Sequence, residues 1–246
     1  MGKLIILAGP SCVGKSPLDK ALARFYPEMR EHLQHLVLYN SRSPRPGEKD
    51  GIDYHFRDRS QIEALDQSDR YVVMDVRGDL QALDIEELKS QLSRGDVFFE
   101  GNPFVGRILQ THENLKDIER LSVFMSPLSK DEIAALVSPD ANANLEKILT
   151  DIMRRKLLRR TRKQKGELSL KDLENIERRA SSALTELKNA HHFEHIIPNH
   201  DGEDSENWDA FYYPVGDARK ALLAFVALMK GHKSNHVETW NADLIA

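Results

Sequence analysis

The sequence predicts an α/β fold in which a parallel sheet is covered by helices. Short apolar runs alternate along the chain with amphipathic stretches, and this alternation predicts parallel strands joined by right-handed helical crossovers. The first apolar run, residues 4–8, leads directly into a glycine-containing loop, which is typical of a strand buried on both faces. The chain has 246 residues, 40% of them hydrophobic, enough for one substantial core and unlike collagen-like or disordered sequences.

The predicted elements follow one another in a regular order. Apolar runs predict strands at 4–8, 36–39, 71–74, 97–99, 121–125 and 195–197. Helical spacing of apolar residues predicts helices at about 17–25, 61–66, 84–93, 103–115, 145–160, 170–190 and 216–230. We expect the least order in the acidic run 200–207 and a loosely held tail after Gly231.

Charge and cysteine content narrow the class of protein. With 35 basic and 39 acidic residues the net charge is −4, so the chain lacks the overall basic excess of a protein that coats nucleic acid. Cys12 is the single cysteine, which excludes an intrachain disulfide and, with no secretory signal recognisable after Met1, favours a reducing, cytoplasmic location. No run approaches the roughly 18 apolar residues of a transmembrane helix, so we expect no membrane partner.

A phosphate-binding loop follows the first predicted strand. Residues 9–16, GPSCVGKS, fit the pattern G-x-x-x-x-G-K-[ST] and precede the first predicted helix. In such a loop the glycines allow backbone N–H groups to surround phosphates, while the lysine supplies a mobile charge and the hydroxyl can ligate Mg²⁺. We therefore predict a site for ATP and Mg²⁺ formed by Gly9, Pro10, Ser11, Cys12, Val13, Gly14, Lys15, Ser16 and Pro17.

Two residues of this loop raise separate questions. Pro17 is tolerated in a first helical turn but disfavours the helical conformation of Ser16, so we expect the metal-ligating geometry to be slightly displaced. Cys12 lies near a helix N-terminus and Lys15, which would favour a reactive thiolate. A small residue packed against the sheet is the other interpretation of Cys12.

A second motif, residues 41–56, has the sequence SRSPRPGEKDGIDYHF. Its two arginines, Arg42 and Arg45, can take phosphate oxygens in a bidentate manner, and the hydroxyl of Tyr54 adds a donor. A Pro-Gly turn at 46–47 stiffens the segment. Taken alone, the same residues are also compatible with a solvated charged loop.

Together the two motifs closely resemble the guanylate kinase family, whose second loop, TTRxPRPGExxGxDYxF, holds the phosphate of GMP. Residues 176–186 are similar to the family's IxxRLxxAxxE helix, and Phe193, Ile197 and Asn199 to its FDxxIxN strand. The resemblance touches most of residues 3–230. It implies a three-layer P-loop NTPase fold over 1–230, with a parallel sheet core (1–35, 95–137 and 185–230), a nucleotide-monophosphate-binding lobe (36–94), a helical lid (138–184) and a tail at 231–246.

The resemblance also implies an activity, the transfer of the γ-phosphoryl group of Mg-ATP to GMP to give GDP and ADP. By position Arg179 is the lid arginine that reaches the transferring phosphates, with Arg160 or Arg162 as a second, alongside Lys15 and Arg42. Ser16 and, through water, Glu100 would position Mg²⁺. The implied acceptor-binding residues are Ser41, Arg42, Arg45, Tyr54, Asp75, Gln81 and Glu100.

The departures from the family fall mainly on the part that contacts the base. Leu38 replaces a serine, and residues 78–83, GDLQAL, replace the family's G-x-Y-Y-G-T stretch. Asp75 stands near the position where the family recognises guanine with a glutamate, and Glu100 retains one acid of the family's L-D-x-D-x-Q-G strand. We therefore expect the grip on phosphate to be better retained than the recognition of guanine.

Other interpretations remain open. Basic residues crowd 154–165 without interleaved aromatic residues, which favours a solvated helix face, with a few lid arginines, over a nucleic-acid patch. Two alternative functions are a non-catalytic module of guanylate-kinase shape that binds a protein, and a kinase for another phosphorylated acceptor such as a sugar phosphate. The complete P-loop disfavours the first, and the altered base-contacting segment favours the second. The sequence leaves the oligomeric state open.

Overall fold

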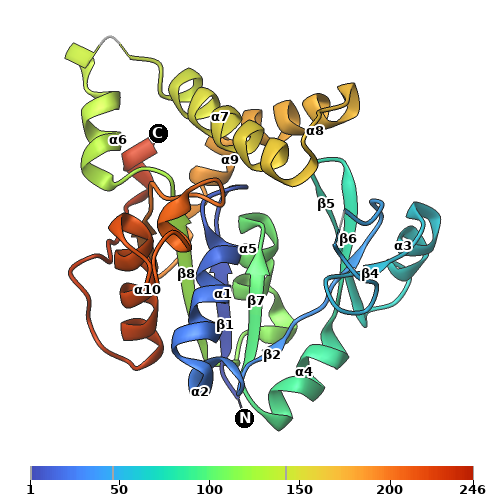
Figure 1. Ribbon diagram of the computed structural model, residues 1–246. Helices are drawn as coiled ribbons and strands as arrows, with labels where there is room; N and C mark the ends of the chain where they lie inside the picture. The colour runs from blue at the N-terminus through green and yellow to red at the C-terminus, as the bar shows by residue number, and fades with distance from the viewer. Residues whose placement is uncertain (1, 46, 142, 246) are drawn as a thin grey trace.

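A five-stranded parallel sheet forms the centre of the protein (Figure 1). The computed structural model describes residues 2–45, 47–141 and 143–245, so Met1, Asn142, Ala246 and Pro46 of the predicted turn lie outside the described residues. The strands are β1 (Leu4–Ala8), β2 (Gln34–His35), β7 (Val97–Gly101), β8 (Arg120–Ser126) and β9 (His195–Pro198), in the order β2-β7-β1-β8-β9. All four neighbouring pairs are parallel, which confirms the predicted α/β class.

Helices cover both faces of this sheet and give three layers. Side chains of β1 alternate: Ile5 and Leu7 pack with helices α1 (Lys15–Phe25) and α10 (Gly216–Met229), whereas Leu4 and Ile6 pack with α4 (Ile85–Arg94) and α5 (Pro103–Thr111) on the other face. Because all five β1 side chains are buried, a continuous apolar run with no polar alternation is what this position requires.

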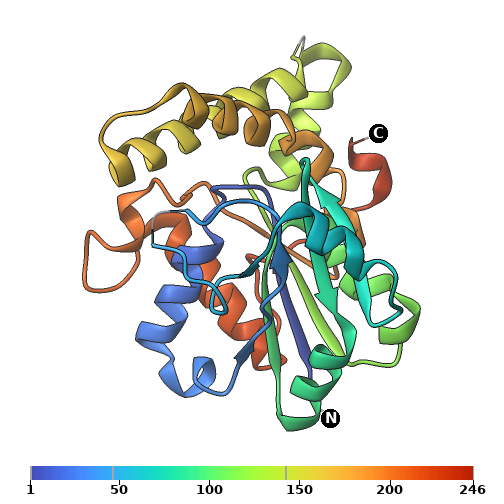
Figure 2. The ribbon, with the colours of Figure 1, turned by 90° about the vertical axis from the view of Figure 1, so that its right-hand side faces the viewer.

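A smaller, four-stranded sheet stands beside the central one (Figure 2). Its strands are β3 (Tyr39–Asn40), β4 (His55–Phe56), β5 (Tyr71–Val76) and β6 (Asp79–Asp84), in the order β4-β3-β6-β5, and helix α3 (Arg59–Leu65) packs on it. We call residues 39–84 the small lobe. The hairpin between β5 and β6 turns at Arg77 and Gly78, both with positive φ, as tight two-residue hairpin turns require.

A helical hairpin crosses the top of the molecule in both ribbon views (Figures 1 and 2). It consists of α7 (Leu145–Lys165) and α8 (Leu170–Ser181), and it continues into α9 (Ala183–Leu187). Leu149, Met153 and Leu157 recur every four residues along α7 and are buried in the same cluster as Ile176 and Ala180 of α8. This 3.6-residue periodicity gives α7 one apolar face and leaves its basic residues on the others.

The remaining elements are short. They are the helices α2 (Pro27–Arg30) and α6 (Lys130–Val137) and the 3₁₀ turns η1 (Glu113–Leu115), η2 (Pro139–Ala141), η3 (Ala190–His192), η4 (Glu206–Trp208) and η5 (Ala242–Ile245). Within the three described ranges, no helix has the length and apolar character needed to cross a membrane.

Several predicted boundaries differ from the structure. The predicted strand 36–39 is wrong, because β2 ends at His35 and β3 begins at Tyr39, so Leu36 and Leu38 belong to the connection between the two sheets. The predicted helix 170–190 is interrupted at Ser182, and 103–115 ends at Thr111. Strand β6 and helices α2 and α6 were not predicted. Buried polar residues in β6, Gln81 and Asp84, mask the apolar pattern of a strand.

The prediction of weak order at 200–207 and after Gly231 is also wrong. The carboxylate of Asp201 accepts hydrogen bonds from Asn207 Nδ2 and from the backbone N–H of Ala218. In the tail, Glu238 pairs with Ile196 at the edge of the central sheet and Trp240 is buried. Polar side chains here satisfy backbone groups instead of remaining solvated, a possibility that composition does not reveal.

Candidate active site

A cleft of about 520 Å³ lies where the phosphate loop, the small lobe and the α7–α8 hairpin meet. Its volume is within the range of small-molecule sites. Segments far apart in the sequence contribute to it, and the predicted site residues that line it are Gly9, Ser11, Cys12, Lys15, Ser16, Arg42, Arg45, Tyr54, Gln81, Glu100, Arg160 and Arg179. The fold therefore brings most of the predicted site residues together.

Backbone geometry explains the glycines of the phosphate loop. A Cβ on Gly9 would lie 2.4 Å from the carbonyl oxygen of Met125, and one on Gly14, where φ is 104°, would lie 2.5 Å from Asn199 Nδ2. Neither position accepts a side chain without displacing its neighbours. The remaining predicted residues of the loop, Pro10, Val13, Gly14 and Pro17, shape it without lining the cleft.

Lys15 is buried, and its ammonium group folds back onto its own loop. Nζ donates to the carbonyl oxygens of Gly9 at 3.0 Å and Pro10 at 2.9 Å. Burial lowers the pKa of Lys15, and the nearby carboxylates of Glu203 and Glu100 act in the opposite direction. A cation that lines the cleft and is held by neutral carbonyl groups is available to an anionic ligand.

Ser16 and Glu100 meet at the carboxyl end of the central sheet. Ser16 Oγ donates to Glu100 Oε1 at 2.7 Å, and burial raises the pKa of Glu100 to about 7, although Lys15 and the Ser16 hydroxyl lower it. Ser16 is helical despite Pro17, and the first helical turn is closed by a bond from Leu18 N to Gly14 O. The hydroxyl and carboxylate are oxygen ligands of the kind that Mg²⁺ prefers.

The acceptor-side motif is organised around Glu48, which the sequence did not single out. Both terminal nitrogens of Arg42 donate to the Glu48 carboxylate, at 2.6 and 2.7 Å, and the backbone N–H of Arg45 donates to it at 2.7 Å. The guanidinium of Arg42 lies 5.1 Å from the ring centroid of Tyr54. The three-residue spacing between Arg45 and Glu48 is the feature of the sequence that could have indicated a role for Glu48.

Two arginines reach the cleft from the helical hairpin. Arg179 is only 7% exposed, and its Nε donates to Ser11 Oγ in the phosphate loop at 3.0 Å. Burial lowers the pKa of Arg179 well below its usual range, and the nearby cations Arg160 and Arg45 act in the same direction. The second arginine is Arg160, which pairs with Glu203. A buried guanidinium group with further cations beside it favours an anionic ligand.

Beyond the phosphate loop, three predicted site residues do not line the cleft. Arg162 is exposed, because a step of two residues from Arg160 turns a helix by about 200°. Ser41 Oγ instead accepts the backbone N–H of Leu80 at 2.8 Å. Asp75 accepts the N–H of Gly78 and faces away, because successive strand side chains alternate and Val76 points inward. Arg77 and Asp79 line the cleft in its place.

The environment of Cys12 contradicts the reactive-thiolate interpretation. Its side chain is 1% exposed, and burial raises the pKa of the thiol to about 12, with Glu203 contributing in the same direction. Its φ of 66° lies in the left-handed region, which residues other than glycine seldom adopt. Cys12 is therefore a packed, inert thiol.

A parallel sheet, a glycine-containing loop that runs into a helix N-terminus, and arginines converging from two further parts of the chain define an ATP-dependent nucleotide kinase of the P-loop class. The family model described as guanylate kinase matches residues 1–99. The guanylate kinase of Cereibacter sphaeroides is 31% identical over 157 residues, which are 63% of this chain and 72% of that relative.

Two other similarities extend over more of the chain. The guanylate kinase of a Synechococcus strain is 29% identical over 216 residues, 87% of this chain and 83% of the relative. The crystal structure of guanylate kinase from Anaplasma phagocytophilum shares 15% sequence identity and aligns with a TM-score of 0.53 over 94% of this chain and 85% of that one, which shows a common fold. The chain belongs to the guanylate kinase family.

Proposed function

We propose that the protein transfers the γ-phosphoryl group of ATP to GMP, giving ADP and GDP. The observation that carries the proposal is that Lys15 of the phosphate loop, Arg42 of the acceptor motif and Arg179 of the helical hairpin line one cleft. The relatives named above are guanylate kinases, and their similarity spans most of the chain.

The cleft supplies what phosphoryl transfer requires from a protein, alignment of two substrates and neutralisation of charge. Lys15 would leave the carbonyls of Gly9 and Pro10 for the donor phosphates, and Arg179 would reach the same phosphates from Ser11. Arg42 and the Tyr54 hydroxyl would hold the acceptor phosphate from the opposite side. None of these groups needs to become a covalent nucleophile.

Ser16 and Glu100 fit a magnesium ion. Their oxygens are in hydrogen-bond contact, and the raised pKa of the buried Glu100 marks a carboxylate that gains from a nearby cation. When bound there, Mg²⁺ supplies neutralisation of charge on the phosphate oxygens. The chain's own contribution is to hold Ser16 at the first turn of α1 and Glu100 at the end of β7.

The basic residues of α7 support a structural and catalytic role over nucleic-acid binding. Five of them pair with acidic side chains: Arg154 with Glu177, Lys156 and Arg159 with Asp204, Arg160 with Glu203, and Lys165 with Asp172. Because acidic side chains neutralise part of its charge, the surface of α7 is less positive than the run of basic residues in the sequence indicated.

A second candidate is phosphorylation of another phosphate-bearing acceptor, such as a sugar phosphate. Leu38 and Gln81 line the acceptor part of the cleft, and neither provides the hydroxyl that the family has there. The residues predicted to hold the acceptor phosphate, Arg42, Arg45 and Tyr54, in contrast all line the cleft. These observations keep open which group is attached to the acceptor phosphate.

The test is a panel of acceptors with Mg-ATP and purified protein. We expect ADP to form with GMP and mass spectrometry to identify GDP. Turnover only with a sugar phosphate would replace GMP by the second candidate. Absence of ADP formation with every acceptor, from folded protein, would favour a non-catalytic module.

A further inference from the structure

The segment between β9 and α10 lies directly on the phosphate loop. Asn199 Nδ2 donates to the carbonyl oxygen of Val13 at 2.8 Å. A Cβ on Gly202 would lie 2.2 Å from the carbonyl oxygen of Cys12, so only a glycine allows this approach of the two backbones. We call residues 200–208 the covering loop.

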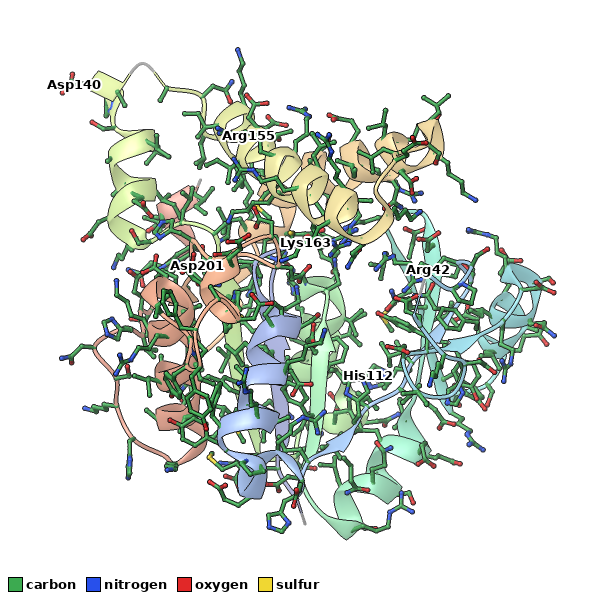
Figure 3. All side chains as sticks on the ribbon, in the orientation of Figure 1. Arg42, His112, Asp140, Arg155, Lys163 and Asp201 are labelled. Atoms are coloured by element: carbon green, nitrogen blue, oxygen red, sulfur yellow. The ribbon has the colours of Figure 1, made fainter. Side chains whose placement is uncertain are left out.

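The covering loop is braced by its own polar residues. Asp201 accepts from Asn207 Nδ2 at 2.9 and 3.0 Å through its carboxylate and from the indole N–H of Trp208 at 2.8 Å through its carbonyl oxygen. The ammonium group of Lys156 on α7 donates to the carbonyl oxygen of His200. Figure 3 shows Asp201 on the opposite side of the central helix α1 from Arg42, which lies on the small lobe.

Within the covering loop Glu203 directs its carboxylate into the cleft. It lines the cleft together with Lys15 and Arg179. Arg160 Nη1 donates to Glu203 Oε2 at 2.5 Å, and the two side chains are 15% and 11% exposed. A carboxylate so far removed from water requires such cationic partners.

The cations around Glu203 are those assigned above to the donor phosphates. Although burial acts to raise the pKa of Glu203, the charges of Arg160, Lys15 and Arg179 hold it below its usual value. Conversely, Glu203 is the largest charge influence on Lys15 and the largest attractive one on Arg160. A carboxylate thus interacts electrostatically with the cations that a phosphate group would need.

We propose that Glu203 is an internal occupant of the donor-phosphate site, and that its carboxylate competes with the phosphates of ATP for Arg160, its ion-pair partner, in the cleft that Lys15 and Arg179 also line. The inference rests on the proposed function of the cleft. Because two anions cannot share these cations in a buried site without strong repulsion, ATP must displace Glu203 to bind. The free energy needed to displace Glu203 reduces the net free energy of ATP binding. Glu203 therefore sets how tightly the enzyme binds ATP.

The test compares ATP binding by the wild type, Glu203→Gln and Glu206→Gln, with Mg²⁺ present, by titration calorimetry. Glutamine keeps the shape of the side chain and removes its charge, so we expect Glu203→Gln to bind ATP roughly 10-fold more tightly. Glu206 is an exposed carboxylate of the same loop, and its variant should bind ATP like the wild type. Inorganic tripolyphosphate should show the same difference, since the competition concerns phosphates.

Unchanged or weaker ATP binding by a folded Glu203→Gln would overturn the inference while leaving the proposed function in place. The same holds if its affinity is unchanged and only kcat falls, which would make Glu203 a positioning residue for Arg160. If neither the wild type nor Glu203→Gln binds ATP, both the inference and the proposed function are wrong.

A measurement on the wild type decides the question even if the variant does not fold. Displacement of Glu203 should loosen its loop, so saturating Mg-ATP is expected to increase backbone hydrogen exchange in a peptide spanning 200–208. Stronger protection of this peptide on ATP binding would contradict the displacement.

Discussion

The two sides of the cleft are built in different ways. On the donor side, the phosphate loop joins a strand with all five side chains buried to a helix that packs on the central sheet. On the acceptor side, β3 and β4 have two residues each, and among the described residues the lobe's own core contains three buried side chains, Ile62, Leu80 and Ala82. Burial stabilises the donor side, whereas the small lobe has little apolar area to contribute.

The small lobe depends more on ion pairs. Arg77, at the tip of its hairpin, donates through Nε to Glu186 of α9 at 2.6 Å, and Glu186 is fully buried. Arg42 and Glu48 form a second pair within the lobe. The donor site is therefore preorganised by packing, whereas the acceptor site is held by polar contacts that a substrate's own charges can rearrange.

The largest expected effect is on the donor side. Lys15→Ala should lower kcat by about 10³-fold, because the residue supplies a charge aimed at the transferred group. The melting temperature should stay close to that of the wild type, because Glu100 keeps its hydrogen bond with Ser16, Glu203 keeps its pair with Arg160, and the cost of burying the Lys15 ammonium group is removed. Lys188→Ala, which removes an exposed lysine outside the cleft, is the control. Turnover near the wild-type rate would contradict the assignment of the phosphate loop.

A smaller effect is expected on the acceptor side. Arg42→Ala should raise the KM for GMP about 30-fold, corresponding to about 2 kcal/mol for a charge-assisted bidentate contact. The KM for ATP should hardly change. Arg94→Ala removes an arginine paired on the surface with Glu87 and should change neither constant. An effect on ATP alone would show that the two sides of the cleft have been assigned the wrong substrates.

Base recognition should be weaker than phosphate recognition. With Leu38 and Gln81 in the acceptor part of the cleft, we expect the ratio of kcat/KM for GMP over AMP to stay below about 10⁴, because higher selectivity rests on hydrogen-bonding groups built for the base. Gln81→Ala should reduce this ratio by about 10-fold, whereas Gln67→Ala, an exposed change in the same lobe, should not. A wild-type ratio well above 10⁴ would place base recognition on other residues.

The smallest effect concerns the contact of the covering loop with the core. His200 lies between two carboxylates: its Nδ1 is 2.5 Å from Asp217 Oδ2, and its Nε2 is 2.9 Å from Glu132 Oε2. Although burial lowers the pKa of His200, these two carboxylates raise it overall. The contribution of His200 to folding stability is therefore complete below its pKa in the unfolded chain, about 6.5, and is lost as the pH rises through its higher pKa in the folded protein.

His200→Gln should lower the melting temperature by about 1–3 °C at pH 6 and by less at pH 9, as expected of a partly exposed ion pair. Thermal unfolding of both proteins across this pH range provides the measurement. A difference that does not vary with pH would show that hydrogen bonding, without charge, accounts for the contribution of His200.

The same contrast between the two sides explains what the sequence could predict. The donor loop is continuous in sequence, so the motif located Lys15 and Ser16 directly. Which acceptor-side residues face the cleft depends on the pairing of β3, β5 and β6. An error of one residue in a strand exchanges the side chains that point into the cleft for those that point away, which is why Asp75 was predicted where Val76 lies. The sequence could not decide whether Arg160 or Arg162 faces the cleft, because that depends on how α7 is oriented about its own axis.

Glu203 could not be found from sequence at all. Its place in the cleft depends on the hydrogen bond between Asn199 and Val13 and on the turn organised by Asp201. The composition of residues 200–207, in contrast, resembles that of a disordered acidic segment. The prediction of disorder failed because several polar side chains in this loop, among them His200, Asp201 and Glu203, have specific partners, and hydrophobicity-based reasoning carries no information about such pairs.

The burial of Cys12 has a practical consequence. Since the sole native thiol is packed within the phosphate loop and its pKa is raised to about 12, thiol-reactive dyes at neutral pH will react with cysteines introduced on the surface and spare the native one. Exposed positions such as Gln67 on the small lobe and Lys163 on α7 can then carry a donor and an acceptor fluorophore. The separation of lobe and hairpin during turnover becomes observable in single molecules without first removing a residue of the active site.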